Sequence, residues 1–344
     1  MPDIIRVLIV DDSAFVRKVL RQILTKSPFI DVVGVARDGV EAMEMIEQLQ
    51  PDVVTLDLNM PRGDGLMFLH SQMRKRPLPI LVVSMASKDG DQVLEALEAG
   101  AVDVIQKPTG LATDRLYEIT NELVAKVKTA AMARVHAPEA PSSPEVHIPS
   151  PPTTPKVDIV VIGISTGGPQ ALKYLIPRLP REFPVPIAIV LHMPIGYTQL
   201  FAHSLHEVSE LDVLEATEGQ RVQPGQVLLA PAGLHLSLTR QRDGAVLTHL
   251  DMQPLDTPHR PAVDVLFQSA ADVFGERTLA IVMTGMGSDG TQGAAWVKAR
   301  GGRVVAEAEE SCVVYGMPRS VIEAGICDQI APLGKMVQVI LEAL

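Results

Sequence analysis

Three polar residues in the second half of this sequence could together activate a nucleophile. Ser165, His192 and Asp289 each stand at or just beyond the end of a separate apolar run. A serine hydroxyl becomes a strong nucleophile when a histidine removes its proton, and a carboxylate orients that histidine and stabilises its charged form. If folding brings the three residues together, these residue types predict acyl-transfer chemistry.

The sequence around Ser165 is typical of a turn between a buried strand and a helix. Residues 157–162 form a largely apolar, β-branched run, and Pro169 has the fixed φ that suits a helix start. Between them, the spacing Gly163-x-Ser165-x-Gly167 matches the nucleophile elbow, a strained turn that exposes a serine hydroxyl. A glycine-rich turn that cradles phosphate, or that only closes tightly, is the alternative interpretation.

His192 and Asp289 also have ordinary interpretations. A histidine near the end of an apolar strand can be a satisfied core residue, and Asp289 stands where it could cap a helix beginning at residue 291. The chain order serine, histidine, aspartate differs from that of α/β-hydrolases, which excludes that family. Backbone amides at a helix start can form an oxyanion hole, which indicates Thr166 and an amide of the 285–287 loop.

Other polar residues in the second half of the sequence do not indicate a functional site. His203 and His206 are spaced three apart on a predicted helix, but without cysteine or acidic partners at ligand spacing they do not indicate a metal site. Glu307 and the acidic residues at 309 and 310 are expected in a solvated loop.

A second set of polar residues ends the strands predicted in the first part of the chain. Its members are two neighbouring acids, a third acid, a hydroxyl and a lysine: Asp11, Asp12, Asp57, Ser84 and Lys107. Carboxylates repel one another unless a hard cation lies among them, and oxygen ligands suit Mg²⁺. Lysine can pair with an anion and serine can donate to a phosphoryl oxygen, so the set predicts phosphoryl chemistry. Capping of the first helix by Asp12 or Ser13 is the ordinary alternative.

Both sets require parallel sheets, because ligands of such sheets bind beyond the carboxyl ends of the strands. Apolar runs alternate with helical periodicity five times within residues 4–131, and the alternation resumes from residue 156. Short strands within 213–250 are expected to form an antiparallel excursion. We therefore expect an α/β fold with two doubly wound parallel-sheet domains, the second a three-layer α/β/α domain.

The composition changes between the two halves. Seven of the nineteen residues 137–155 are proline, which predicts an extended, semi-rigid linker. The expected boundaries are residues 1–125 for the first domain, 126–155 for a helix end and the linker, and 156–344 for the second domain.

The overall composition excludes several classes of protein. The formal net charge of −11 argues against a nucleic-acid surface, and no helix-turn-helix pattern indicates a DNA-binding output domain. Two cysteines in 344 residues indicate a reducing compartment without a disulfide framework. We find neither a signal peptide nor an apolar run long enough to cross a bilayer, and expect a cytoplasmic protein.

The first half resembles a response-regulator receiver domain over roughly residues 1–125. The resemblance is carried by DDS at 11–13, DLNMP at 57–61, VVSMAS at 82–87 and QKP at 106–108. It implies that Asp57 accepts a phosphoryl group from a histidine kinase. It also implies that Asp11, Asp12, Asp57 and the Asn59 carbonyl hold Mg²⁺, and that Ser84 and Lys107 sense the phosphate.

The second half resembles the catalytic domain of chemotaxis protein-glutamate methylesterases. The motifs are GISTGGP at 163–169, LHMP at 191–194, MTGMGSDG at 283–290 and CVVYGMP at 312–318. The resemblance implies hydrolysis of glutamate γ-methyl esters on the cytoplasmic domains of chemoreceptors, with methanol released and receptor glutamines deamidated. Ser165 is then the nucleophile, His192 the base and Asp289 the orienting acid, with Thr166 and Met286 lining the oxyanion hole.

The resemblance requires no cofactor for the ester chemistry, no nucleic acid and no insertion into a membrane. Two positions depart from the family pattern: Ile164 where a small residue is usual, and Gly63 where an apolar residue is common. The order of a phosphate switch, a tether and a hydrolase suggests that the unphosphorylated receiver domain covers Ser165. A regulator whose second domain only binds a partner is the non-enzymatic alternative.

Overall fold

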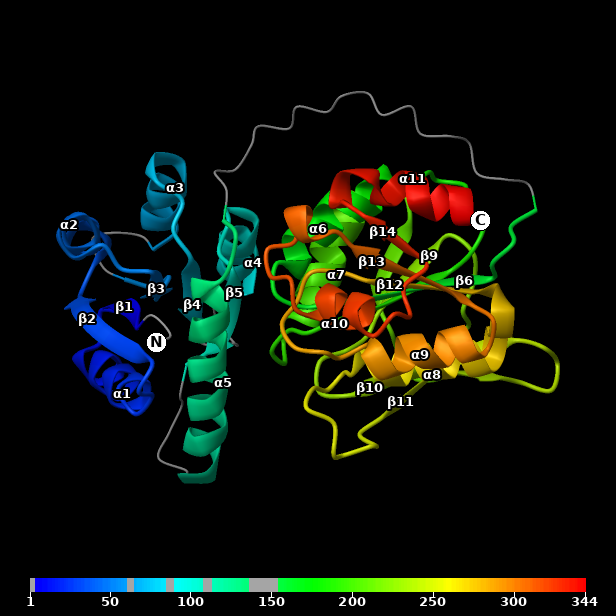
Figure 1. The fold of residues 1–344 in the computed structure, drawn as a ribbon, viewed down its shortest axis with the longest axis horizontal. Coiled ribbons are helices and arrows are strands. Elements are labelled where there is room, and N and C mark those ends of the chain that lie inside the picture. The colour runs from blue at the N-terminus through cyan, green and yellow to red at the C-terminus, as the bar shows by residue number, and fades with distance from the viewer. Residues whose placement is uncertain (1–3, 61–64, 85–89, 108–112, 136–153) are drawn as a thin grey trace. The chain divides into compact units, whose positions relative to one another are not determined.

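The computed structural model describes residues 4–60, 65–84, 90–107, 113–135 and 154–344, and it divides into two compact units, 1–142 and 143–344 (Figure 1). The proline-rich segment 137–155 lies outside the described residues apart from its last two positions, as do Gly63 and its loop. None of the described helices combines the length and the apolar character needed to cross a membrane.

The first unit alternates strands and helices as predicted. Its strands are β1 (Ile5–Val10), β2 (Ile30–Ala36), β3 (Val53–Leu56), β4 (Ile80–Ser84) and β5 (Asp103–Gln106). They pair in parallel in the order β2-β1-β3-β4-β5. The helices are α1 (Ala14–Leu24), α2 (Gly39–Leu49), α3 (Gly65–Lys75), α4 (Gly90–Glu98) and α5 (Thr113–Ala131). Helix α1 packs with α5, and α3 packs between α2 and α4.

The second unit contains a seven-stranded parallel sheet in the order β14-β13-β12-β6-β7-β9-β8. Its strands are β6 (Ile159–Ile164), β7 (Ile187–Leu191), β8 (Asp212–Glu215), β9 (Gln226–Leu229), β12 (Thr278–Val282), β13 (Arg303–Glu307) and β14 (Gln329–Ala331). A separate antiparallel hairpin is formed by β10 (His235–Arg240) and β11 (Val246–Asp251). The expected antiparallel excursion is therefore limited to this hairpin. Strands β8 and β9 pair in parallel and extend the main sheet.

Helices cover both faces of this sheet (Figure 1). They are α6 (Gly168–Leu175), α7 (Thr198–Glu207), α8 (Val263–Phe274), α9 (Thr291–Ala299), α10 (Met317–Glu323) and α11 (Leu333–Ala343). One apolar core joins the central strands to α8, α9, α10 and the hairpin. Helix α6 contacts α7 and α11, and Figure 1 shows these three helices on the other side of the sheet. The expected three-layer α/β/α architecture is confirmed.

Candidate functional sites

The sheet places Ser165 and His192 side by side. Strands β6 and β7 pair in parallel up to Ile164 and Leu191, so Ser165 and His192 are the next residues in this register. The backbone N–H of His192 donates to the carbonyl of Ile164 across 3.1 Å, which continues the pairing to the histidine itself. Parallel strands therefore bring the two residues together at the carboxyl edge of the sheet.

Ser165 lies in a tight turn between β6 and α6. Its carbonyl accepts a hydrogen bond of 2.7 Å from the Gly168 N–H, and the positive φ of +80° falls on Gly167. Among the described residues the one non-glycine with a positive φ is Gln50, so the strain expected at the serine itself is absent. Gly163 belongs to the strand, where a β-carbon would lie 2.9 Å from Val263 Cγ2. Because glycine has no β-carbon, the first turn of α8 can approach β6 at Gly163.

His192 contacts Asp289. The Nε2 atom lies 2.9 Å from Asp289 Oδ2, and both side chains are about nine-tenths buried. The other ring nitrogen, Nδ1, is buried and has no hydrogen-bond partner among the described residues. The histidine is thus not the fully satisfied core residue of the ordinary interpretation: one nitrogen is oriented by an acid and the other is available to accept a proton.

Asp289 is held at the N-terminus of α8. Its Oδ2 accepts from the N–H of Val263 at 2.8 Å and its Oδ1 from the N–H of Asp264 at 3.0 Å. Burial raises the pKa of this carboxyl, but the hydrogen bonds from His192, Val263 and Asp264 outweigh it, so the pKa lies below its usual value. The alternative role as cap of the helix at 291 is wrong: Gly290 is the N-cap of α9, and the Gly293 N–H in its first turn donates to Asp264 Oδ1 at 2.7 Å.

The loop that carries Asp289 also packs against the serine. The Ser165 N–H donates to the Thr284 carbonyl at 3.0 Å, and a β-carbon on Gly285 would lie 2.7 Å from Ser165 Cβ. Of the two predicted oxyanion residues, Thr166 is buried beside Ser165 and Met286, which follows Gly285, is 38 % exposed. Both therefore lie on segments that contact the serine.

Two residues near this edge were missed by the sequence analysis. The ring of His259 stacks on that of His192, with centroids 4.2 Å apart and planes inclined by 25°; no pattern around residue 259 indicated it. Glu307, expected in a solvated loop, is fully buried as the last residue of β13. The signal for Glu307 was available, since it directly follows the apolar run 304–306.

The two spaced histidines of α7 contact nearby residues. His203 pairs with Glu207 at 3.5 Å on the exposed face of α7, and His206 Nδ1 accepts from the Val213 N–H at 3.2 Å.

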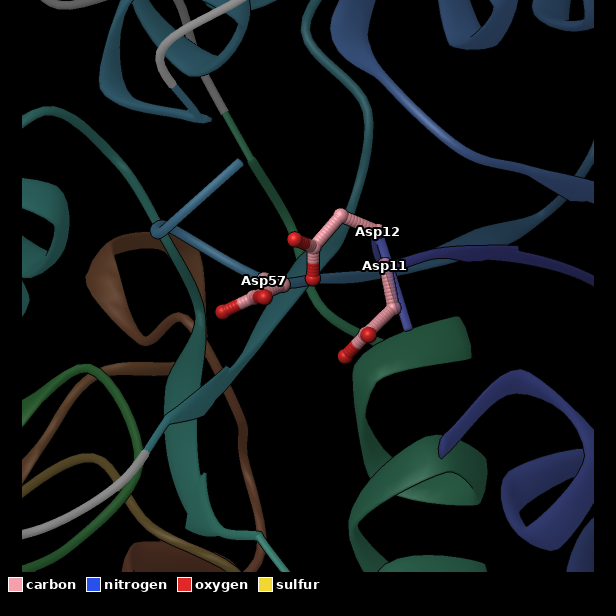
Figure 2. A group of neighbouring side chains, drawn as sticks. All are labelled: Asp11, Asp12 and Asp57. Carbon is pink, nitrogen blue, oxygen red and sulfur yellow. The ribbon is translucent and has the colours of Figure 1, made fainter. Parts of the chain in front are cut away.

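The first unit gathers the predicted acids at the carboxyl edge of its sheet. Asp11 and Asp12 follow β1, and Asp57 follows the neighbouring strand β3 (Figure 2). Each offers a carboxylate oxygen, and these oxygens lie within 4.8 Å of one another. Asp11 and Asp57 are buried, whereas Asp12 is exposed. Three acids this close favour a divalent cation, and oxygen donors of this kind suit Mg²⁺.

Lys107, after β5, reaches the same acids. Its Nζ lies 2.6 Å from Asp57 Oδ2 and 3.0 Å from Asp11 Oδ2. Lys107 thus pairs with one buried oxygen of each of these two acids. Burial raises the pKa of Asp57 to about 6 despite the opposing effect of Lys107. Three clustered acids, one of which is reluctant to ionise because it is buried, fit a site that takes additional positive charge.

The remaining predicted residues lie around Asp57. Ser84 is the buried last residue of β4, and its carbonyl accepts from the Lys107 N–H at 2.7 Å. The Asn59 N–H donates to Asp57 Oδ1 at 3.2 Å. Every residue predicted for this site thus falls at the end of β1, β3, β4 or β5, or within two residues of Asp57.

The fold and the two sites define a class of protein, the response regulators, here with an α/β output domain. The model of the family described as CheB methylesterase matches residues 160–340, and that of the response regulator receiver domain matches residues 7–120. The chain belongs to the CheB methylesterase family.

Similar proteins support this membership over the whole chain. A Myxococcus xanthus (strain DK1622) protein named protein-glutamate methylesterase/protein-glutamine glutaminase 5 is 51% identical over 335 residues, which are 96% of each chain. A Thermotoga maritima protein with the same name but without the numeral is 43% identical and covers 98% of each chain. The crystal structure of the Thermotoga maritima CheB methylesterase catalytic domain matches with 47% identity and a TM-score of 0.53, covering 55% of this chain and 99% of that chain.

Proposed function

We propose that this protein hydrolyses glutamate γ-methyl esters on chemoreceptors, and deamidates receptor glutamines, under control of phosphorylation at Asp57. The names of relatives that align over nearly the full chain support the reaction. The observation that carries the assignment of the site is the Asp289–His192 pair beside Ser165, formed by residues from the ends of β6 and β7 and from the loop after β12. Because the proposed substrates are cytoplasmic domains of receptors, we propose that the enzyme acts in the cytoplasm.

Acyl transfer begins when Ser165 Oγ attacks the γ-carbonyl carbon of the substrate and His192 takes the hydroxyl proton. Since Nε2 is engaged by Asp289, the accepting atom is Nδ1. The negative oxygen of the tetrahedral intermediate is stabilised by backbone N–H groups of Thr166 and Met286. The intermediate collapses as His192 returns the proton to the leaving oxygen, and methanol departs.

Hydrolysis of the acyl-enzyme repeats these steps with water. His192 takes a proton from the water, whose oxygen attacks the ester carbon, and the proton then passes to Ser165 Oγ as the glutamate carboxylate is released. With a glutamine substrate the first leaving group is ammonia. Asp289 holds the imidazole in one orientation and stabilises its protonated form, for which its lowered pKa keeps it ionised.

In the receiver domain, Asp57 is the acceptor of a phosphoryl group from a histidine kinase. Asp11, Asp12, Asp57 and the backbone carbonyl of Asn59 would hold Mg²⁺, which when bound neutralises charge on the transferring phosphoryl group. Lys107, already 2.6 Å from Asp57, pairs with the phosphorylated side chain, and the Ser84 hydroxyl donates to a phosphoryl oxygen.

Phosphorylation activates the enzyme by relieving inhibition by the receiver domain. We assign residues 1–125 to this domain, 126–155 to a helix end and a proline-rich linker, and 156–344 to the catalytic domain. A short tether keeps the receiver domain at high local concentration, so that a weak contact is sufficient to inhibit.

The test is methanol release from methylated receptor, measured with and without a small-molecule phosphodonor. The wild type should release methanol and respond to the phosphodonor, whereas Asp57→Asn should keep the basal rate and lose the response. Failure of the wild type to release methanol under either condition would contradict the esterase assignment. An equal response from Asp57→Asn would contradict the assignment of the phosphoacceptor.

A further inference from the structure

Glu307 is a fully buried carboxylate that the mechanism above does not use. It ends β13, the neighbour of β12 on the side away from β6. No lysine, arginine or histidine among the described residues forms an ion pair with it. Burying a carboxylate without a counter-ion is unfavourable unless its oxygens accept hydrogen bonds. The hydrogen-bond partners of Glu307 therefore indicate what this side chain does at the sheet edge.

Both oxygens of Glu307 accept hydrogen bonds from loops at the carboxyl edge. Oε2 accepts from the backbone N–H of Thr284 at 2.8 Å, and Oε1 accepts from the hydroxyl of Ser311 at 2.9 Å. Thr284 opens the loop that follows β12, while Ser311 also accepts from the Leu333 N–H at 2.9 Å. One oxygen thus faces the catalytic edge and the other faces the start of α11.

Thr284 connects Glu307 to the turn that carries the nucleophile. Its carbonyl accepts from the Ser165 N–H at 3.0 Å, and its hydroxyl donates to the Thr166 carbonyl at 2.9 Å. The same hydroxyl accepts from the Val314 N–H at 3.0 Å. The N–H, the carbonyl and the hydroxyl of Thr284 all form hydrogen bonds, and together these bonds fix the position of Thr284 relative to Ser165.

The loop that begins at Thr284 carries much of the remaining site. Gly285 packs against Ser165, Met286 is the second predicted oxyanion residue, and Asp289 orients His192. A shift at Thr284 would therefore move the oxyanion amide and the nucleophile relative to each other. Misplacement by about 1 Å can lower the rate of a catalysed step about 100-fold.

We propose that Glu307 is a positioning residue that acts through Thr284 to fix the Ser165–Thr166 turn against the 284–290 loop. The inference rests on the proposed function, because it assigns Glu307 a part in the reaction of Ser165. What the site requires is a hydrogen-bond acceptor for the Thr284 N–H, and a negative charge is not needed. Burial raises the pKa of Glu307, which agrees with a side chain that serves as an acceptor in an apolar setting.

Three variants separate positioning from simple structural support. Glu307→Gln keeps an acceptor for Thr284 and can donate to Ser311, whose hydroxyl has the Ala308 carbonyl 3.3 Å away. Glu307→Leu keeps most of the volume but removes the acceptor. Ser311→Ala, the matched control, disturbs the oxygen of Glu307 that faces away from the catalytic edge and leaves the Thr284 contact in place.

Two measurements on the full-length protein should be compared: methanol release and the rate at which diisopropyl fluorophosphate modifies Ser165. In the second reaction Oγ attacks phosphorus, fluoride leaves, and the adduct is located by mass spectrometry. For Glu307→Leu we expect kcat and the modification rate to fall roughly 10- to 100-fold with little change in KM. For Glu307→Gln we expect both within about threefold of wild type, and for Ser311→Ala a lower unfolding temperature with unchanged kcat.

Wild-type rates in a folded Glu307→Leu would overturn the inference, as would an equal loss in Glu307→Gln. If Glu307→Leu does not fold, Thr284→Val replaces it, since valine keeps the N–H but loses the hydroxyl bonds to Thr166 and Val314. Wild-type rates in Thr284→Val, with Thr284→Ser as its control, would also overturn it. A wild-type enzyme that neither releases methanol nor reacts at Ser165 would instead contradict the proposed function.

Discussion

Replacing Asp289 by asparagine removes the charge of the orienting acid without changing its size. The two carboxylate oxygens accept from three donors: His192 Nε2 at 2.9 Å, the Val263 N–H at 2.8 Å and the Asp264 N–H at 3.0 Å. Asparagine offers one oxygen and one NH₂ group. If the NH₂ group takes the place of Oδ2, it faces the Val263 N–H and makes His192 accept at Nε2; if it takes the place of Oδ1, it faces the Asp264 N–H.

The expected effect on catalysis follows from the tautomer of His192. If Nε2 accepts a hydrogen bond, the proton of a neutral imidazole lies on Nδ1, which is the atom required as the base. In serine proteases the corresponding change lowers kcat by roughly 10⁴-fold. We expect a fall of about this size here, with KM little changed because no substrate-binding surface is altered.

The expected effect on stability follows from the role of Asp289 at the start of α8. Loss of a helix cap and of a charge-assisted hydrogen bond costs about 1–3 kcal/mol. Because the pKa of Asp289 is lowered in the folded protein, the carboxylate stabilises the fold above its unfolded value of 3.8. This contribution is lost as the pH falls through the folded pKa. The difference in unfolding free energy between wild type and Asp289→Asn should therefore be largest near neutral pH and shrink below pH 4.

Methanol release at saturating substrate and thermal unfolding together test this prediction. Asp328→Asn is the matched control, since Asp328 also accepts a backbone hydrogen bond, from Val304 at 2.7 Å, but lies outside the site. It should lose stability and keep its kcat. A folded Asp289→Asn enzyme with kcat within about tenfold of wild type would refute the role of Asp289 as the orienting acid.

Three further predictions concern neighbouring parts of the two domains. His259→Ala removes the ring stacked on His192 and should lower kcat about 2- to 10-fold, whereas His259→Phe keeps a stacking partner and should retain most activity; equal kcat for both variants would contradict a role for stacking. Because burial raises the pKa of Glu307, this carboxyl keeps its proton in the folded protein at pH values above 4.5 where it loses it in the unfolded chain, so its own contribution to stability falls as the pH rises. In urea unfolding, Glu307→Gln should therefore be more stable than wild type at pH 8 and equal to it near pH 4; no gain at pH 8 would contradict this. Mg²⁺ at 100 times its Kd should stabilise the wild-type receiver domain by about 2.7 kcal/mol in thermal unfolding and should not stabilise Asp57→Asn, and equal stabilisation of both would place the ion elsewhere.

The strand ends were the part of the site that the sequence could predict. Several apolar runs that become central strands are followed directly by a polar residue, as with Ser165 after β6 and His192 after β7. In a parallel sheet all carboxyl ends lie at one edge, so residue type and position were sufficient to place these side chains together. The same reasoning placed Asp11, Asp57 and Lys107.

Contacts made by loops could not be predicted in this way. Asp289 lies seven residues beyond β12, and the amides that hold it belong to Val263 and Asp264, which are more than twenty residues away in sequence. The choice of Nε2 for Asp289 depends on that loop geometry and has no sequence signal. Periodicity likewise cannot distinguish the parallel β8 and β9 from the antiparallel hairpin, because short strands alternate alike in both.

Glu307 shows how a local pattern can mislead. Two of the three residues after it are acidic, so the whole stretch has the composition of an exposed loop. The structure divides it at Glu307, which ends β13 inside the domain, while Glu309 and Glu310 begin a short 3₁₀ helix at the surface. Burial of the first acid depends on the Thr284 N–H, which comes from another strand end.

The central claim is that the Ser165 hydroxyl attacks the ester, and methanol release by two serine variants tests it most directly. Ser165→Ala should reduce the rate at saturating methylated receptor by at least about 10³-fold while leaving the fold intact. Ser288→Ala changes an exposed serine beside Asp289 and should release methanol at the wild-type rate. Methanol release by a folded Ser165→Ala enzyme at a rate near that of Ser288→Ala would contradict the account.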